Sequence, residues 1–197
     1  MAEKKTSPLI LASASPRRRQ LLADAGYDFI IIPPEIDESA YLSDHLSPCQ
    51  YAEQLALAKA KSIAEKHPDS LVIGADTIVD FQGKIIGKPL DAEDARRIVR
   101  MLFSSPHKVI TGLAICRSQD NIEFVTHAST TIYPKPMTPK QIDEHIKSDS
   151  WKDKSGAYAI QENGDEFIEK IEGSLTNVMG LPMEILTQLL HELAIEK

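Results

Sequence analysis

The segment LILASASPRRR, residues 9–19, joins a short apolar run to three arginines and decides how the chain begins to fold. Leu9 to Ala12 suits a buried strand, and Ser15 followed by Pro16 is typical of the first residues of a helix. Gly26 is expected to end that helix. The segment therefore predicts a strand followed directly by a helix that begins at the arginines.

The start of such a helix is suited to binding phosphate. Its unpaired N–H groups and its dipole favour an anion, and the forked guanidinium groups of Arg17 and Arg18 match phosphate oxygens. A solvated basic turn before a capped helix would have the same sequence, so this segment alone leaves both interpretations open.

Strands and helices alternate along the rest of the chain, which predicts an α/β fold with a mixed twisted sheet and flanking helices. Strands are expected at 29–32, 71–79, 84–86, 109–116, 122–133, 157–161 and 167–171, and helices at 48–67, 92–102, 139–147 and 183–193. The long alternating segment 122–133 fits either an edge strand open to a partner or a strand with one face on the core.

The composition bounds the class of protein. The chain has 197 residues, of which 42% are hydrophobic, and we expect one domain over residues 1–197. Its net charge of −7 argues against nonspecific nucleic-acid binding. No apolar run approaches the roughly 20 residues that span a bilayer, and no secretory signal is visible, so we expect a cytoplasmic protein without membrane contact. Cys49 and Cys116 are expected to fill the core.

The apolar segment 71–79 contains one carboxylate, Asp76. A buried carboxylate needs a cation, a metal ion or the mouth of a cleft, so Asp76 is a candidate catalytic residue. A structural ion pair with a nearby lysine is the alternative. The small residues Gly74 and Ala75 are expected to let a ligand approach the backbone.

Lys59, Lys88 and Lys154 could together neutralise a triphosphate, although an isolated lysine is usually a solvated surface residue. Lys59 is the strongest candidate because its stem lies in an apolar helix and its charge would reach toward a pocket. Glu38 fits a solvated acidic loop, but together with Asp76 it would offer oxygen ligands for Mg²⁺ or Mn²⁺.

Other familiar catalytic motifs are absent from the sequence. The histidines show no metal-ligand spacing, and His107 is expected to be a structural group. Neither a P-loop nor a Gly-x-Ser-x-Gly motif occurs, which disfavours P-loop ATPases and serine hydrolases. Phosphate chemistry in this chain would need another scaffold.

Taken in order, the short motifs form one pattern over nearly the whole chain, and this pattern resembles the Maf family of nucleotide pyrophosphatases. The matching motifs are Ser13-x-Ser15-Pro16-Arg17-Arg18, Leu55-Ala56-x-x-Lys59-Ala60, Gly74-Ala75-Asp76-Thr77, Gly87-Lys88-Pro89, His107-x-Val109-x-Thr111-Gly112, Lys154-x-Gly156-Ala157-Tyr158-x-Ile160-Gln161 and Ile171-x-Gly173-Ser174-x-x-Asn177-Val178-x-Gly180-Leu181-Pro182. Departures from the family pattern are Gln54 for arginine, Ser155 for alanine and Met183 for leucine, and none removes a catalytic group.

The resemblance implies two lobes around a central cleft, and hydrolysis of a nucleoside triphosphate to the monophosphate and pyrophosphate with a divalent metal, Mg²⁺ or Mn²⁺. It implies that Asp76 is the proton acceptor, with Asp76 and Glu38 as metal ligands. Arg17, Thr77 and Gln161 match the subgroup acting on dTTP and UTP rather than on methylated GTP. The phosphate-binding residues expected on this basis are Ser13, Arg18, Lys59 and Lys88.

For the base, the Gln161 amide could accept from N3–H of thymine or uracil and donate to a ring carbonyl. A flipped amide would suit cytosine, so neighbours such as Thr77 must orient it, and CTP is a candidate side substrate. Gln161 could instead pair with backbone near Tyr158.

Two other functions remain open at this stage. One is a nucleotide-sensing regulator of cell division or septum formation that does not turn its ligand over. The other is a broader pyrophosphatase that removes modified pyrimidine or inosine nucleotides. A homodimer is expected by analogy with the family alone.

Overall fold

A seven-stranded mixed sheet forms the centre of the computed structural model, which describes residues 7–41, 45–152, 154–158 and 167–195. The strands are β1 Leu9–Ala12, β2 Phe29–Ile31, β3 Val72–Phe81, β4 Lys84–Ile86, β5 His107–Arg117, β6 Ile122–Pro134 and β7 Ile168–Glu172. The α-helices are α1 Pro16–Asp24, α2 Pro48–Ala64, α3 Ala92–Leu102, α4 Pro139–Lys147, α5 Leu175–Met179 and α6 Met183–Glu192, and short 3-10 helices lie at Glu38–Ala40, Ser118–Asp120 and Ser155–Ala157.

The strand order is β2-β1-β3-β5-β6-β7, with β4 also paired to β3. β2, β1 and β3 are parallel, whereas the remaining pairs are antiparallel. The prediction of a mixed α/β sheet with flanking helices is therefore confirmed.

One edge of β3 is paired by two different strands. β1 pairs with Val72–Gly74, and β4 pairs with Val79–Phe81. Between these two pairings, no strand of the described residues lies beside residues 75–78 on that edge. This unpaired part of the edge includes Asp76 and Thr77, and Thr77 is the one of these four residues that is partly exposed.

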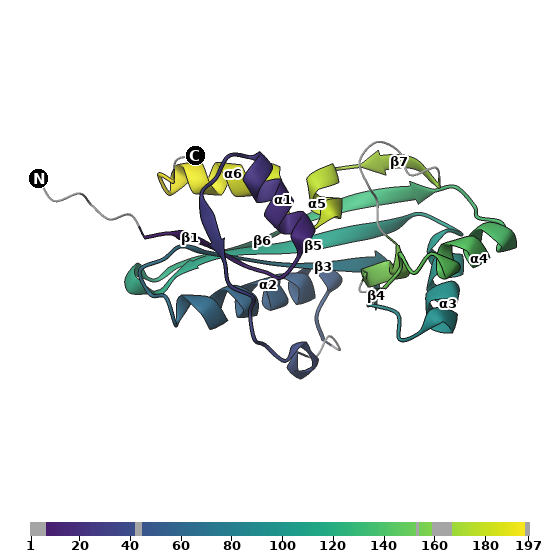
Figure 1. The fold of residues 1–197 in the computed structure, drawn as a ribbon, viewed down its shortest axis with the longest axis horizontal. Helices are drawn as coiled ribbons and strands as arrows, with labels where there is room; N and C mark the ends of the chain where they lie inside the picture. Colours follow the sequence, from purple (N-terminus) through teal and green to yellow (C-terminus); the bar gives the residue numbers. More distant parts are fainter. Residues whose placement is uncertain (1–6, 42–44, 153, 159–166, 196–197) are drawn as a thin grey trace, which may run out of the picture.

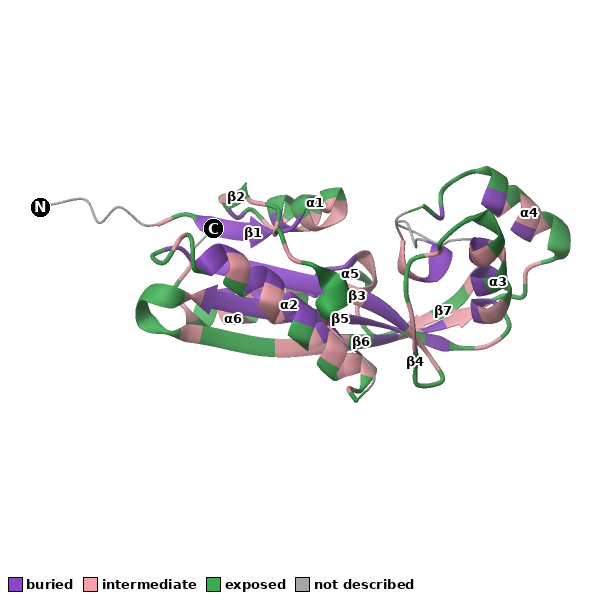
Figure 2. Cartoon of the chain, turned by 90° about the horizontal axis from the view of Figure 1, so that it is seen from below, coloured by how far each residue is buried: buried purple, intermediate pink, exposed green. Residues whose placement is uncertain are grey.

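Helices cover both faces of the sheet (Figure 1). α2 covers one face, where its alanines and Ile63 contact β1, β3 and β5. α1 and α6 cover the other face through Leu22, Leu186 and Leu190. α3 and α4 lie at the far end of the sheet and form a separate apolar cluster with Trp151 and Tyr158. In Figure 2 the buried residues, in purple, occupy much of β1, β3 and β5 and shorter stretches of the helices.

Two glycines bring α2 directly onto the sheet. A Cβ atom at Gly74 would lie 2.3 Å from the carbonyl oxygen of Ala56, and one at Gly112 would lie 2.1 Å from that of Ala52. The expectation that a ligand approaches the backbone at Gly74 is wrong, because the α2 backbone fills that space. This close approach places Lys59 of α2 above the middle of β3.

The helix starts follow the capping residues. Ser15 accepts a hydrogen bond from the backbone N–H of Arg18, and Ser47 and Thr138 each form a capping box before a proline. Gly26, with φ +83°, follows the end of α1. These boundaries agree with the sequence prediction to within a few residues.

Two predictions at the C-terminal end differ from the structure. Ala157 was expected to begin a strand, but Gly156 and Ala157 have φ of 77° and 60° in a 3-10 turn, which no strand permits. Residues 159–161 lie outside the described part of the chain. The sequence analysis also missed α5, which begins after the Ser174 cap and ends at Gly180.

β6 is an edge strand over part of its length, because β7 pairs only with its residues 131–134. Phe124 and Val125 are exposed on the unpaired part.

Cys116 is buried beneath α2 and burial raises the pKa of its thiol to about 11, whereas Cys49 is only partly buried. In the described ranges, no helix is long and apolar enough to span a bilayer.

Candidate functional site

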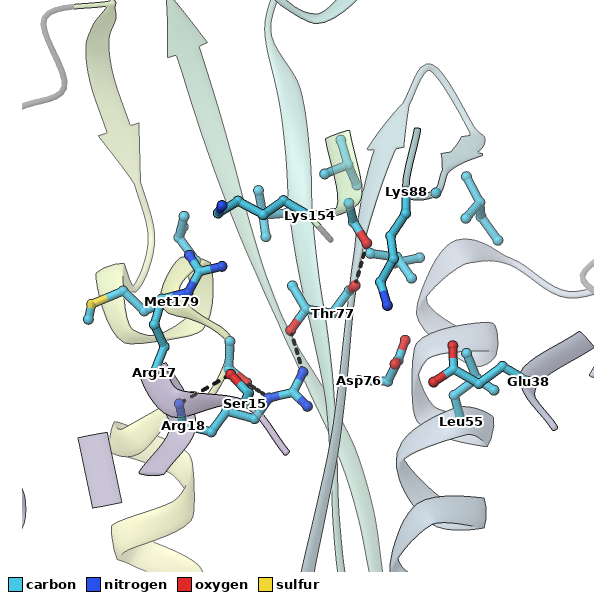
Figure 3. Close-up of a pocket in the computed structure, with 18 of the residues that line it drawn as sticks. Ser15, Arg17, Arg18, Glu38, Leu55, Asp76, Thr77, Lys88, Lys154 and Met179 are labelled. Atoms are coloured by element: carbon cyan, nitrogen blue, oxygen red, sulfur yellow. Dashed lines mark hydrogen bonds between the residues drawn. The ribbon is translucent and has the colours of Figure 1, made fainter. Parts of the chain in front are cut away.

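A pocket of about 390 Å³ lies at the open edge of β3. It is lined by residues from α1, α2, β3, the segment after β4, the 3-10 turn at residues 155–157, and α5 (Figure 3). The predicted site residues on its lining are Arg17, Arg18, Glu38, Lys59, Asp76, Thr77, Lys88 and Lys154. The fold therefore brings together side chains that are up to 137 positions apart in sequence, from Arg17 to Lys154.

Asp76 and Glu38 share one ammonium group. Lys59 Nζ lies 2.6 Å from Asp76 Oδ1 and 2.7 Å from Glu38 Oε1. Lys59 and Asp76 are 8% and 7% exposed, so the ion pair is largely shielded from solvent. The ion pair with a lysine that the sequence allowed for Asp76 is therefore present. Asp76 also lines the pocket, and its catalytic role stays a prediction.

Glu38 reaches this site from a capped turn. The Asp37 side chain accepts from the backbone N–H of Ser39 and begins the 3-10 helix Glu38–Ala40. Partial burial by itself raises the pKa of Glu38, but the hydrogen bond and charge of Lys59 outweigh it, so the pKa lies below its usual value. Glu38 is thus held as a carboxylate by Lys59, although half of its side chain is exposed to solvent.

The Arg18 guanidinium forms hydrogen bonds with other parts of the protein. Its guanidinium donates to the carbonyl oxygens of Gly180 at 2.7 Å and Ala75 at 2.9 Å, and to the hydroxyl of Thr77 at 3.0 Å. It also donates to Ser13 Oγ at 3.3 Å. Burial lowers its pKa. These contacts link α1, β3 and the turn after α5, so Arg18 supports the pocket wall.

Arg17 and Lys88 differ from Arg18 in having few contacts with protein groups. Both line the pocket, and within the described residues neither forms a hydrogen bond or an ion pair with another side chain. Partial burial lowers the pKa of Arg17. The charge of Arg17 is directed to the pocket, whereas the charge of Lys88 also helps to lower the pKa of Glu38 across it. Lys154, the third cation on this side, is already engaged by the carbonyl of Ser150.

Thr77 lies on the other side of β3 from Asp76, as expected for neighbours in a strand (Figure 3). Its hydroxyl contacts Arg18 and Thr111, and its carbonyl oxygen accepts from Ser155 Oγ at 3.2 Å. Ser155, where the family pattern has alanine, thus donates a hydrogen bond to a backbone carbonyl on the unpaired edge of β3. The sequence analysis noted this departure but assigned no contact to it.

Among the described residues, the predicted phosphate ligand Ser13 does not line the pocket. Ser13 is buried, and its hydroxyl accepts from the backbone N–H of Ser15 and from Arg18. Its assignment to phosphate binding stays a prediction. Gln161 lies outside the described residues, so its assignment to base selection is also a prediction.

His107 is structural, as expected. It is buried, with Nδ1 3.1 Å from the carbonyl oxygen of Leu102 and Nε2 2.6 Å from the Tyr158 hydroxyl. A neutral ring that donates from Nδ1 and accepts at Nε2 satisfies both contacts. Tyr158 lines the pocket and was not predicted as a site residue.

The donor set fits a magnesium-like ion. In the described part of the chain, no three His, Cys, Asp or Glu side chains gather as a metal site. Mg²⁺ is usually bound through one or two carboxylates, with water and substrate phosphates completing its shell. Glu38 and Asp76, which already share one cation, supply that number of carboxylates.

Comparison with known proteins agrees with this geometry. The family model described as "Maf-like protein" matches residues 8–193. A relative from Moorella thermoacetica, named dTTP/UTP pyrophosphatase, is 45% identical over 93% of this chain and 94% of its own length. Relatives of the same name from Elusimicrobium minutum and Symbiobacterium thermophilum are 46% and 40% identical, again over 93% of this chain, and cover 97% and 93% of their own lengths. The chain belongs to the Maf family.

Proposed function

We propose that this chain hydrolyses dTTP and UTP to the monophosphate and pyrophosphate. The relatives that match almost its whole length are named for this activity. Arg17 and Thr77, two of the residues that the resemblance assigns to that subgroup, line the pocket. The observation that carries the proposal is a carboxylate, Asp76, at the opening of β3 in a pocket that also contains Arg17 and Lys88.

In this proposal Arg17 and Lys88, which form no hydrogen bond or ion pair within the described residues, bind the triphosphate oxygens. Asp76 contacts Lys59 through Oδ1, which leaves Oδ2 to accept a hydrogen bond from the attacking water and then its proton. Attack at the α-phosphorus releases pyrophosphate. Most of the rate enhancement comes from positioning and charge stabilisation, as in phosphoryl transfer generally.

Glu38 and Asp76 would hold the divalent ion, Mg²⁺ or Mn²⁺. When bound, the ion supplies positive charge that neutralises the phosphate oxygens. Lys59 holds the two carboxylates close to each other, so the ligand pair is already assembled in the protein. Lys59 is therefore assigned to organising the carboxylates as well as to the predicted contact with phosphate.

The same proposal includes CTP or modified pyrimidine nucleotides as side substrates, a cytoplasmic location, a homodimer and no nucleic-acid partner. A nucleotide-sensing regulator without turnover is the alternative, and the names of the relatives do not favour it. Light scattering on the purified protein would test the dimer.

The test is to incubate the purified chain with Mg²⁺ or Mn²⁺ and a panel of triphosphates that includes dTTP, UTP, CTP, dATP and GTP. We expect pyrophosphate from dTTP and UTP, and in ¹⁸O-water we expect the label in the monophosphate. Asp76→Asn, which is nearly isosteric, should lower kcat at least about 100-fold.

The matched control is Asp80→Asn, since Asp80 is on the same strand but contacts the Gly83 N–H outside the pocket lining. Full turnover by Asp76→Asn would remove Asp76 from the mechanism. Tight nucleotide binding without pyrophosphate release would favour the regulator instead.

A further inference from the structure

The Thr77 hydroxyl belongs to a chain of hydrogen bonds that runs away from the pocket. Thr77 Oγ1 lies 2.9 Å from Oγ1 of Thr111, its partner across the β3–β5 ladder. Thr111 Oγ1 in turn lies 2.9 Å from the carbonyl oxygen of Asn177 in α5. Thr111 and Asn177 are both fully buried, so solvent does not compete for these contacts.

The direction of each hydrogen bond follows from the chemistry of its ends. A carbonyl oxygen only accepts, so the single hydroxyl hydrogen of Thr111 goes to Asn177. Thr111 must then accept from Thr77, which uses the single hydroxyl hydrogen of Thr77. A guanidinium only donates, so Arg18 occupies one lone pair of Thr77 at 3.0 Å.

Within the described part of the chain, one lone pair remains on the Thr77 oxygen. Because Thr77 lines the pocket, the hydroxyl meets a ligand as an acceptor and has no hydrogen left to donate. A surface threonine would rotate its hydroxyl to suit either partner. Here the buried contacts remove that choice.

We propose that Thr111 is a positioning residue for substrate selection, which sets Thr77 as an acceptor for the ring N3–H of thymine or uracil. This inference rests on the proposed function, in which Thr77 is a selectivity residue. Cytosine has a lone pair at N3, and that lone pair would face the remaining lone pair of Thr77. Its donor is the exocyclic amino group instead, so a preference for dCTP in the unmodified protein contradicts the proposal.

The test replaces the Thr111 hydroxyl with a methyl group of similar size. In Thr111→Val the Thr77 hydrogen is released and can be donated to cytosine N3. We expect the ratio of kcat/KM for dTTP to that for dCTP to fall about tenfold, the effect of roughly one hydrogen bond. Thr111→Ser keeps the hydroxyl and should restore the original ratio.

Thr130→Val is the matched control. Thr130 is also a fully buried threonine, and its hydroxyl donates to the Ser174 carbonyl and accepts from the Asn177 amide, but it does not contact Thr77. It should lower stability as Thr111→Val does, because each change removes a hydroxyl donor from a backbone carbonyl of α5 or its cap. Its dTTP to dCTP ratio should stay unchanged.

A binding measurement separates this inference from the proposed function. Calorimetry with the α,β-imido analogues of dTTP and dCTP reports selection without hydrolysis, and Thr111→Val should narrow the difference between the two Kd values. Hydrolysis of dTTP with no change in either ratio would overturn the role of Thr111 alone. Absence of hydrolysis with a narrowed binding ratio would overturn the proposed function and support Thr111.

Discussion

The Arg18 guanidinium donates to the carbonyl oxygen of Gly180 at 2.7 Å, across 162 positions of sequence. Gly180 has φ +110°, and a Cβ atom there would lie 3.4 Å from both Arg18 Nε and Thr77 Oγ1. The turn after α5 therefore approaches α1 and β3 closely, in a backbone conformation that side chains rarely adopt. Arg18 fixes one wall of the pocket through this contact.

Arg18 and its neighbour Arg17 should respond differently to the same substitution. Arg18→Met leaves the Ala75 and Gly180 carbonyls without their donor, so we expect a loss of about 3 kcal/mol in the free energy of unfolding. Arg17→Met should change stability by no more than about 0.5 kcal/mol. It should nevertheless lower kcat/KM for dTTP at least about tenfold, since it removes a cation from the pocket.

Urea unfolding of both variants and their steady-state kinetics check this prediction. An Arg18→Met variant as stable as the unmodified protein would contradict the structural role of Arg18. An Arg17→Met variant with unchanged kinetics would contradict the assignment of Arg17 to the triphosphate.

Lys59→Met should make stability depend on divalent ions. Without the ammonium group, Glu38 and Asp76 share the site with no cation between them, and breaking such a shielded pair costs about 3 kcal/mol. We expect a lower Tm in EDTA and a larger rise in Tm on adding Mg²⁺ or Mn²⁺ than in the unmodified protein.

Lys61→Met is the control for this prediction, because Lys61 is on the same helix but pairs with Glu123 at the surface. It should leave the metal response unchanged. Equal metal responses in all three proteins would argue against metal binding by Glu38 and Asp76.

The pair Arg17 and Arg18 shows what sequence could predict and what it could not. The strand, the helix cap and the cation cluster follow from local residue types, and all are present. Successive residues in a helix differ by about 100° in direction, so Arg17 extends into the pocket whereas Arg18 bonds to the Ala75 and Gly180 carbonyls in its wall. Which arginine does which depends on α5, a helix of five residues that is too short to show a periodic pattern.

Gly74 shows a second limit. A small residue at this position indicates that another group packs closely against the backbone. A ligand and a helix backbone both require the missing side chain, so the sequence does not distinguish them. In the structure the group is the backbone of α2. The prediction at Ala157 failed in a similar way. Gly156 is typical of a turn, but the apolar residues after it favour a strand in the sequence. In the structure the positive φ of Ala157 excludes a strand there.

Stability should fall as the pH drops through the ordinary range of histidine, because of His107. Burial lowers the pKa of His107 below 6.5, although backbone hydrogen bonds partly oppose it. In the unfolded chain the ring gains a proton near pH 6.5, whereas in the folded protein it stays neutral to lower pH. The unfolded state therefore binds more protons in this window, and stability decreases as the pH falls from about 7 toward the folded pKa.

In this window, His107 should make the free energy of unfolding fall by about 1 kcal/mol for each unit that the pH is lowered. This pH dependence of stability should be lost in His107→Gln and kept in His191→Gln, where the replaced histidine is exposed. Urea unfolding between pH 7 and 5.5 measures the dependence. If His107→Gln shows the same slope as the unmodified protein, the buried ring of His107 is not held neutral.

The contact between α2 and the sheet gives the last prediction. Gly112→Ala places a methyl group 2.1 Å from the Ala52 carbonyl oxygen, and backbone on both sides leaves it no room to move. We expect a loss of at least about 3 kcal/mol or failure to fold, and the same for Gly74→Ala. Gly87→Ala is the control for stability alone, since a Cβ atom there meets nothing within 4 Å but Gly87 lines the pocket. Because α2 also carries Lys59, a Gly112→Ala protein that still folds should lose turnover of dTTP as well. Normal stability and turnover in Gly112→Ala would show that α2 does not depend on this close approach.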